Sequence, residues 1–164
     1  MPVIILEGID GSGKSTLAEA LKQASPIPAT IVHRGPLEGT VEDELIYPLN
    51  RVGSDELLIA DRWHVGEMIY GPIYRGRSEV FGEYNTIIEN LLQDMNAVRI
   101  IMSPPLDIVE DRLNERGEDY LLPEHAEEVY NFYENYAIQF GWILLDEVTD
   151  TTVDQILRAA LEEK

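Results

Sequence analysis

A glycine-rich segment near the beginning of the chain carries the residue types that bind phosphate. Its sequence, Gly8-Ile9-Asp10-Gly11-Ser12-Gly13-Lys14-Ser15-Thr16, contains the pattern G-x-x-x-x-G-K-[ST]. In such a loop the glycines let backbone N–H groups face phosphate oxygens, the lysine reaches the β- and γ-phosphates, and the hydroxyl binds Mg²⁺. We therefore predict that this loop binds ATP and Mg²⁺ through Gly8, Asp10, Gly11, Ser12, Gly13, Lys14, Ser15 and Thr16.

The segments on either side of the loop support this prediction. An apolar run that begins at Val3 predicts a strand leading into the loop, and a helix is predicted from Lys14 to about Ala24. The N-terminus of that helix would add the positive end of its dipole to an anion site. The alternative is a glycine-rich turn that only connects a strand to a helix.

Charged residues also follow the second and third predicted strands. Arg34 follows the strand at 29–33, and Asp61 and Arg62 follow the strand at 56–60. In a parallel sheet, ligands collect outside the carboxyl ends of the strands. We predict that Asp61 holds the waters of Mg²⁺ or accepts a hydroxyl proton, and that Arg62 clamps a phosphate. A structural ion pair between neighbouring elements is the alternative.

Short β-branched runs alternate with amphipathic stretches along the chain, which predicts a parallel sheet with helices on both faces. The 164 residues contain no repeat or linker and suit a single domain, residues 1–164. Further strands are predicted at 97–103 and 142–145, and further helices at 42–50, 63–74, 79–96, 106–116, 124–139 and 152–161. We expect a three-layer α/β/α fold around a five-stranded parallel sheet.

The composition restricts the class of partner. With 31 acidic and 12 basic residues, the formal net charge is −19, so the general surface repels nucleic acid, and a small phosphorylated substrate is the easier partner. The absence of cysteine excludes disulfides and thiol catalysis. No apolar run approaches the roughly twenty residues that span a bilayer. We expect a soluble, cytoplasmic protein without membrane contact.

The sequence resembles the thymidylate kinases, a family of P-loop nucleoside monophosphate kinases, over nearly its whole length. The most specific match is residues 7–16, which resemble that family's phosphate loop and share its acidic residue, Asp10. The other matches are Arg34-Gly35-Pro36-Leu37-Glu38-Gly39-Thr40 to an Arg-Glu-Pro-Gly-Gly-Thr segment, Asp61-Arg62-Trp63 to Asp-Arg-Tyr, Tyr70 to a tyrosine that lies against the sugar, Arg112-Leu113 and Arg116-Gly117 to lid arginines, and residues 142–146 to the last strand. The resemblance implies that family's fold, with ATP and Mg²⁺ as cofactors.

The same resemblance implies a site for two nucleotides. ATP would lie on the phosphate loop, and a deoxynucleoside monophosphate would lie between Arg34, Asp61, Arg62 and Tyr70. Asp10 would lie near the sugar and phosphate of this acceptor. The tyrosine would favour deoxyribose.

A lid and a dimer are implied as well. Residues 112–122 would close over ATP and bring Arg112 or Arg116 to its phosphates. The alternative for this segment is the charged end of a helix with a glycine cap. A homodimer would form through helices at 63–74 and 79–96.

Two departures from the family pattern concern the base of the acceptor. Glu67 stands near the place where the family has an amide or a small polar residue, and a carboxylate there favours an exocyclic amino group such as that of cytosine or adenine. The alternative places Glu67 on a solvated helix face or beside a nearby arginine. The interval 40–61 is shorter than in the family and lacks the helix that stacks on and reads the base. Tyr47 and Arg51 are candidate replacements.

Other polar residues have two interpretations. Tyr74, Arg75 and Arg77 stand in a glycine-rich stretch and either contact a nucleotide or lie on the surface. His33 and His64 are expected to be hydrogen-bonded structural histidines, because a kinase of this type needs no strong base.

These observations predict ATP-dependent phosphoryl transfer to a deoxynucleoside monophosphate. The predicted catalytic groups are Lys14, Asp61, Arg62 and Arg116; the metal ligands are Ser15 and Asp61; ATP is also bound by Arg112; and the acceptor is bound by Asp10, Arg34, Arg62, Glu67 and Tyr70. One alternative is a kinase of a hydroxyl acceptor, either a free nucleoside or a hydroxymethylated base in DNA, with Asp61 as general base. Another is a nucleotide-gated switch in which hydrolysis drives a partner.

Overall fold

Five parallel strands form the middle layer of the protein. In the computed structural model, which describes residues 2–116 and 123–162, their order across the sheet is β2-β3-β1-β4-β5. The strands are β1 (Val3–Gly8), β2 (Ala29–His33), β3 (Leu57–Asp61), β4 (Val98–Met102) and β5 (Ile143–Leu145). The predicted α/β fold with a five-stranded parallel sheet is therefore confirmed.

The central strand β1 is buried along its whole length, because β3 and β4 pair with its two edges. Its residues are mostly β-branched or leucine, as expected for a strand covered on both faces. The register pairs Leu6 with Asp61, Gly8 with Met102 and His33 with Asp61. The carboxyl ends of these four strands therefore lie along one edge of the sheet, where the predicted site residues follow them.

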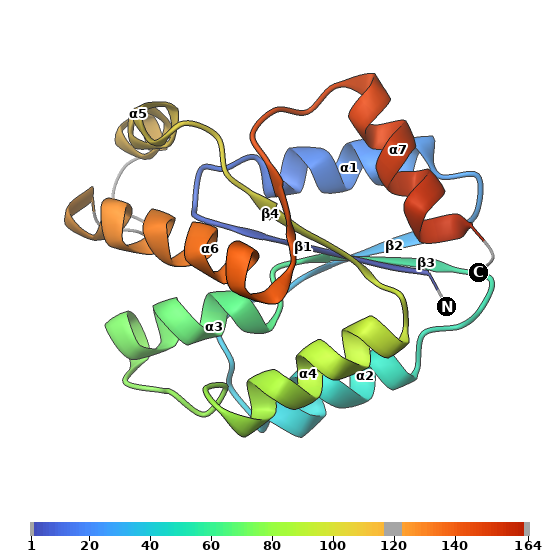
Figure 1. Cartoon of the computed structure of the whole chain (residues 1–164), viewed down its shortest axis with the longest axis horizontal. Helices are drawn as coiled ribbons and strands as arrows, with labels where there is room; N and C mark the ends of the chain where they lie inside the picture. Colours follow the sequence, from blue (N-terminus) through green and yellow to red (C-terminus); the bar gives the residue numbers. More distant parts are fainter. Residues whose placement is uncertain (1, 117–122, 163–164) are drawn as a thin grey trace.

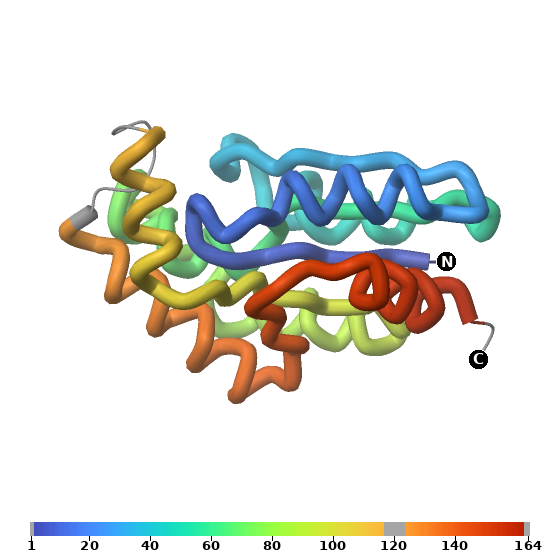
Figure 2. Tube along the Cα trace, turned by 90° about the horizontal axis from the view of Figure 1, so that it is seen from above, coloured from blue at the N-terminus to red at the C-terminus, as the bar shows by residue number. Residues whose placement is uncertain are grey.

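Helices cover both faces of the sheet (Figure 1). Helices α1 (Lys14–Ala24) and α7 (Asp150–Leu161) pack on one face, and α3 (His64–Tyr70), α4 (Glu83–Asp94) and α6 (Ala126–Phe140) pack on the other. The remaining helical segments are η1 (Glu42–Ile46), α2 (Tyr47–Asn50), η2 (Gly71–Arg75), α5 (Leu106–Arg116) and η3 (Pro123–His125). In Figure 2, which looks onto the protein from above, α1 and α7 lie over the strands, and the chain passes from β4 into α5.

The two faces of the sheet bury separate apolar cores. Ile4 and Leu6 of β1 face one core, which they share with Leu17 of α1. Val3 and Ile5 of β1 face the other core, together with residues such as Ile88 of α4. This alternation follows from the two-residue period of a strand. It holds β1 rigidly between two helical layers, and the phosphate loop starts from its end.

Two predicted helices are shorter in the structure. The helix expected at 63–74 ends as α-helix at Tyr70 and continues as a π-helical turn, η2, at a proline that lacks a backbone N–H. The helix expected at 79–96 begins only at Glu83, because Gly82 has a φ of 73°. The helix expected at 42–50 consists of a π-helical turn followed by a short α-helix.

Part of the predicted lid, 117–122, lies outside the described residues. Within the described parts of the chain, no helix combines the length and apolar character needed to cross a membrane.

Candidate functional site

The phosphate loop joins β1 to α1 and depends on glycines with positive φ. Gly8, Gly11 and Gly13 have φ values of 138°, 81° and 95°, which residues with a side chain rarely adopt. A Cβ atom on Gly8 would lie 2.6 Å from the carbonyl oxygen of Met102 in β4. The glycine pattern of the loop therefore has a steric basis in this fold.

The amine of Lys14 lies against the loop itself. Its Nζ donates hydrogen bonds to the carbonyl oxygens of Gly8 at 2.9 Å and Ile9 at 3.0 Å. Burial lowers the pKa of Lys14 to about 8, although the negative charges of Asp61 and Glu7 act in the opposite direction. The amine is thus held where the glycines curl, at the end of the loop that would face a triphosphate.

This lowered pKa predicts a pH dependence. Only the protonated lysine can neutralise phosphate charge, so we expect kcat/KM for ATP to fall as the pH rises through about 8. Lys14→Arg is the matched variant, because a guanidinium stays protonated at these pH values. The residual activity of Lys14→Arg should therefore show no decrease as the pH rises through about 8. Persistence of this decrease in Lys14→Arg would assign it to another group.

The serine and aspartate predicted to bind Mg²⁺ are in contact. Ser15 Oγ donates a hydrogen bond to Asp61 Oδ2 at 2.7 Å, and His33 Nδ1 lies 2.9 Å from the same oxygen. A hydroxyl and a carboxylate are oxygen ligands of the kind that Mg²⁺ takes when phosphates and waters complete its shell. These residues therefore fit Mg²⁺. His33 is hydrogen-bonded, as predicted.

Arg62 has a left-handed backbone conformation, with a φ of 72°, which is uncommon for a residue other than glycine. Its backbone N–H donates to the carbonyl oxygen of Leu6 at 2.8 Å. Its guanidinium forms an ion pair with Asp10 and lies 5.1 Å from the ring centre of Tyr70. The Tyr70 hydroxyl accepts the backbone N–H of Asp10 at 3.2 Å. Asp10, Arg62 and Tyr70, all predicted to bind the acceptor, thus form one cluster.

Burial raises the pKa of Tyr70 to about 12, although the positive charge of Arg62 acts in the opposite direction. The phenol therefore stays protonated at neutral pH. Its hydroxyl can donate to an acceptor molecule while accepting from the loop.

Arg34 is held next to the cluster by a carboxylate that the sequence did not identify. Its Nη2 donates to Glu44 Oε2 at 2.6 Å, and its guanidinium lies 5.4 Å from the ring centre of Trp63. Its backbone N–H donates to the carbonyl oxygen of Asp61 at 3.0 Å. Glu44 belongs to the π-helical turn η1, and nothing in the local sequence marks it as a partner of Arg34.

Glu67 is buried, which corrects the alternative of a solvated helix face. Its Oε1 accepts hydrogen bonds from Arg75 Nη2 at 2.8 Å and from the backbone N–H of Leu37 at 3.0 Å. The alternative that pairs Glu67 with a nearby arginine is confirmed. The adjacent rings of Tyr70 and Tyr74 are stacked, with centroids 6.1 Å apart. A carboxylate, a guanidinium and two aromatic rings therefore share one wall.

Arg112 and Arg116, the two arginines predicted to belong to a lid, lie in the last turns of α5. Arg112 Nη1 donates to the carbonyl oxygen of Gly11 at 2.9 Å, so this side chain contacts the phosphate loop. Arg116 is the last residue of α5 and lines the same cavity as Lys14.

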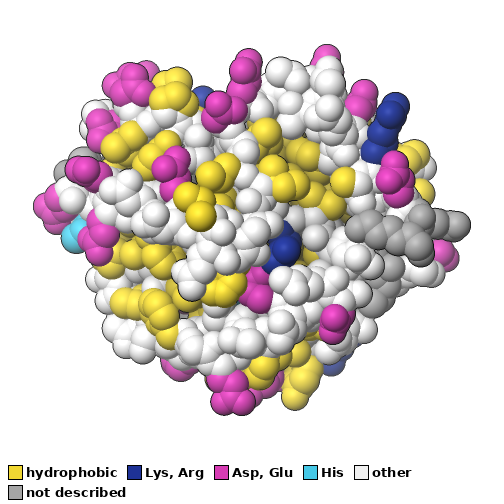
Figure 3. All heavy atoms as spheres, in the orientation of Figure 1, with side chains coloured by type: hydrophobic (Ala, Val, Ile, Leu, Met, Phe, Trp, Pro, Cys, Tyr) yellow, Lys and Arg dark blue, Asp and Glu magenta, His cyan; other side chains and the backbone are white. Residues whose placement is uncertain are grey.

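Most of the side chains described above line one cavity of about 820 Å³. Its lining comes from the phosphate loop, the carboxyl ends of β2 and β3, helix α3 with the turn η2, and the end of α5: Asp10, Gly11, Gly13, Lys14, Ser15, Thr16, His33, Arg34, Gly35, Pro36, Asp61, Arg62, Trp63, Gly66, Glu67, Tyr70, Tyr74, Arg75, Leu113 and Arg116. Five of the chain's 12 basic residues are among them. On the face in Figure 3, by contrast, acidic side chains are scattered widely and basic ones are few.

The candidate replacements for the base-binding helix are placed elsewhere. The described residues that line the cavity do not include Tyr47 or Arg51, and the Tyr47 side chain is 47% exposed. Glu67 and Arg75 line the cavity instead. From the sequence, the pairing of Glu67 with a nearby arginine was one of two alternatives, and the structure confirms it.

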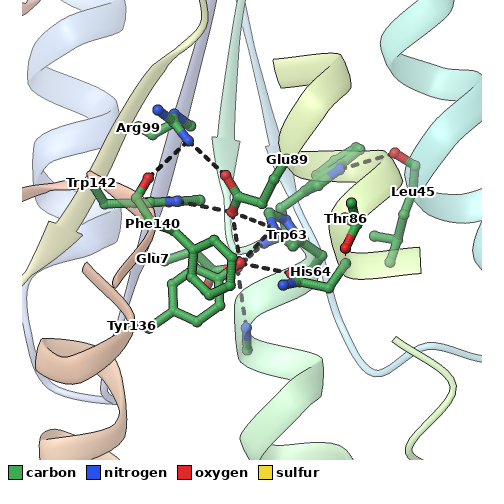
Figure 4. Close-up of polar contacts among 12 residues, drawn as sticks. Glu7, Leu45, Trp63, His64, Thr86, Glu89, Arg99, Tyr136, Phe140 and Trp142 are labelled. Atoms are coloured by element: carbon green, nitrogen blue, oxygen red, sulfur yellow. Dashed lines mark hydrogen bonds and ion pairs between the residues drawn. The ribbon is translucent and has the colours of Figure 1, made fainter. Parts of the chain in front are cut away.

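A buried polar network beside α3 was not predicted from the sequence (Figure 4). Glu89 of α4 accepts hydrogen bonds from His64 at 2.9 Å, Tyr136 at 2.7 Å, Trp142 at 2.9 Å and Arg99 at 2.6 Å. His64 is therefore a hydrogen-bonded structural histidine, as predicted. Tyr136 and Trp142 supply two of the donors.

Comparison with known proteins bears on the fold. The chain matches no protein-family model and no curated protein. A solved structure of similar fold is the YorR protein of Bacillus subtilis in complex with phosphorylated GDP, with 21% sequence identity and a TM-score of 0.70 over 95% of this chain and 91% of that chain.

Two kinases are similar in the same way. They are deoxyadenosine kinase from M. mycoides with bound dATP, at 17% identity and a TM-score of 0.56 over 96% of this chain and 98% of that one, and a gluconokinase from Sinorhizobium meliloti 1021, at 15% identity and 0.54 over 98% and 89%. At these identities the comparison establishes the fold alone. The chain has the fold of P-loop kinases.

Proposed function

We propose that this chain transfers the γ-phosphoryl group of ATP to a deoxynucleoside monophosphate and forms the diphosphate. One observation carries the proposal. The phosphate loop lines the same cavity of about 820 Å³ as three arginines from outside the loop, Arg34, Arg62 and Arg75. A cavity of this size is at the upper end of the range for ligand sites. It offers one place for the triphosphate and a second, arginine-lined place for the acceptor.

The arginines of the second place favour a phosphorylated acceptor. Arg34, Arg62 and Arg75 each pair with one carboxylate, but a guanidinium has five N–H donors, and a monophosphate offers more acceptor oxygens for the remaining donors than a neutral nucleoside does. An oxygen of that monophosphate attacks the γ-phosphorus of ATP, the bond from γ-phosphorus to the bridging oxygen breaks, and ADP leaves with that oxygen. No proton has to be removed from the attacking oxygen, so no general base is required.

The residues of the cavity divide between the two substrates. Lys14 and Arg116 would neutralise the charge of the ATP phosphates, and Arg62 would hold the acceptor phosphate in line with them. Arg34, whose guanidinium is held in place by its ion pair with Glu44, would bind the same phosphate. Mg²⁺ held by Ser15 and Asp61 would supply further positive charge on the phosphate oxygens.

The wall formed by Glu67, Arg75 and the stacked Tyr70 and Tyr74 would receive the sugar and base of the acceptor. A carboxylate accepts hydrogen bonds and therefore favours a base with an amino group. This supports acceptors other than thymidylate. It agrees with the sequence-based expectation for Glu67, and the nucleotides bound in the similar structures, dATP and phosphorylated GDP, also carry amino groups.

Transfer to a hydroxyl acceptor remains the second candidate function, because Asp61 pairs with His33 at the edge of the same cavity and could accept a hydroxyl proton. An assay panel separates the two functions. ATP·Mg²⁺ is combined with each deoxynucleoside monophosphate, each deoxynucleoside, and DNA with or without hydroxymethylated bases. Transfer to a monophosphate supports the proposal, and transfer only to a hydroxyl overturns it.

Arg62→Ala in the same panel tests the acceptor site. We expect kcat/KM for the monophosphate to fall by about 10²- to 10³-fold, because a charged donor to the transferring group is lost, while the KM for ATP changes little. Arg158→Ala, which removes an exposed arginine of α7, is the matched control and should retain full activity. A fall of less than about fivefold in Arg62→Ala would contradict this role for Arg62.

A further inference from the structure

Glu7 is a buried carboxyl group that lies beneath the candidate site and does not line the cavity. It is the residue of β1 before the first glycine of the phosphate loop, and its side chain is fully buried. A polar group inside an apolar strand costs stability unless it is hydrogen-bonded. The hydrogen bonds of Glu7 therefore identify the segments that its carboxyl group stabilises.

The bonds of Glu7 lead to the segment that follows β3. Its Oε1 accepts the backbone N–H of Trp63 at 2.7 Å and that of Gly66 at 3.2 Å. These N–H groups belong to the first turn of α3, for which no side chain within the helix provides a cap. Its Oε2 accepts the hydroxyl of Tyr133 at 3.5 Å. Glu7 thus caps α3 from another element (Figure 4).

The residue before this capped turn is Arg62. Its left-handed φ of 72° is held on one side by the bond from its N–H to Leu6, and on the other by the bond from Trp63 to Glu7. Both acceptors belong to β1, which ends in the phosphate loop. Two adjacent backbone N–H groups, those of Arg62 and Trp63, are therefore hydrogen-bonded to β1, the strand that positions the phosphate loop.

The atoms around these two hydrogen bonds are closely packed. A Cβ atom on Gly66 would lie 3.3 Å from Glu7 Oε2, 3.3 Å from the Tyr133 hydroxyl and 4.0 Å from Arg62 Nη1. Since Glu7 and Arg62 both approach within 4.0 Å of this one point, a shift of the carboxyl group would also move the surroundings of the guanidinium.

We infer that Glu7 is a positioning residue for phosphoryl transfer: its carboxyl oxygen joins the strand of the phosphate loop to the turn that carries Arg62, and so sets the distance between donor and acceptor. The role lies in the acceptor oxygen, which binds two backbone N–H groups. The inference rests on the proposed transfer reaction, but not on which acceptor is phosphorylated.

Two variants of similar shape separate this role from packing. Glu7→Gln keeps an oxygen that can accept the N–H groups of Trp63 and Gly66, whereas Glu7→Met fills the space without one. We expect Glu7→Met to lower kcat by about 10- to 100-fold through misplacement of Arg62, with the KM for ATP within about twofold. Glu7→Gln should retain kcat within about fivefold. Glu19→Gln, at an exposed position of α1, is the control.

A double-mutant cycle with Arg62→Ala shows whether Glu7 affects kcat through Arg62. If Glu7 acts through Arg62, then Glu7→Met lowers kcat in the wild-type background and has almost no further effect when Arg62 is absent. A purely structural role would lower the melting temperature and leave kcat unchanged, or lower kcat equally in both backgrounds. Either result would overturn the inference. If Glu7→Met does not fold, Glu7→Asp, whose oxygen is withdrawn by one methylene, takes its place in the cycle.

The cycle is run with whichever acceptor of the panel is phosphorylated. Transfer only to a hydroxyl would overturn the proposed function and leave the inference about Glu7 to be decided by the cycle. A wild-type chain that phosphorylates nothing would overturn both.

Discussion

Replacement of Lys14 by methionine is expected to reduce phosphoryl transfer by about 10³-fold, because a preorganised cation at the transferring phosphoryl group contributes strongly to stabilising the transition state of such reactions. The Nζ atom lies against the carbonyl oxygens of Gly8 and Ile9, so it is already at the loop when no nucleotide is bound. Methionine keeps most of the side-chain volume and removes the charge. The measurement is kcat/KM for ATP at pH 7.

The stability of the same variant supplies an internal check. Burial disfavours the charged form of Lys14, so Lys14→Met should unfold at the same temperature as the wild type or higher. Loss of activity with unchanged melting temperature assigns the effect to catalysis. Lys22→Met, which removes an exposed lysine from the last turn of α1, is the matched control and should stay fully active. Transfer within tenfold of the wild type in Lys14→Met would contradict the role of the loop.

Replacement of Glu89 by alanine is expected to destabilise the protein by about 3–5 kcal/mol, the range for removing one member of a buried charged network. The carboxylate accepts bonds from His64, Tyr136, Trp142 and Arg99, and its removal leaves these donors without their shared partner. Urea unfolding at pH 7 measures the change in free energy. Glu83→Ala, at an exposed position of the same helix, should cost less than about 1 kcal/mol.

The same network predicts a pH dependence of stability. Burial alone would raise the pKa of Glu89, but the hydrogen bond and charge of His64, together with Tyr136 and Arg99, lower it to about 2 from its ordinary 4.5. The stabilisation is present above pH 4.5 and is lost as the pH falls towards 2. In Glu89→Gln the free energy of unfolding should vary less over this range. An equally steep dependence in that variant would show that other groups cause it.

Several features of the site could be predicted from the sequence because they are encoded by neighbouring residues. The glycines of residues 8–13 require positive φ, and this requirement acts locally whatever the rest of the chain does. The strands were also predictable, because short β-branched runs such as Val3–Leu6, bounded by turn residues, favour strands that are buried on both faces. In the structure the residues of this run alternate between the two apolar cores. Parallel strands then align their carboxyl ends, which places Asp61 and Arg62 near the loop.

Other features depend on contacts that the local sequence does not specify. Glu44 holds Arg34 from a π-helical turn, and Arg75 reaches Glu67 from the turn η2 that continues α3. The interaction of Glu7 with Trp63 spans 56 residues. A carboxylate at any of these positions could equally be solvated, and the local sequence does not distinguish the two cases.

The sequence by itself thus determined the phosphate loop, the parallel sheet and the edge at which ligands gather, because backbone sterics and strand periodicity act over a few residues. Only the tertiary structure decided which buried charges meet. It set Glu67 against Arg75 in the acceptor wall, Glu89 at the centre of a polar network, and Glu7 beneath Arg62. The physical reason is that a buried carboxyl group is stable only where the completed packing supplies its donors.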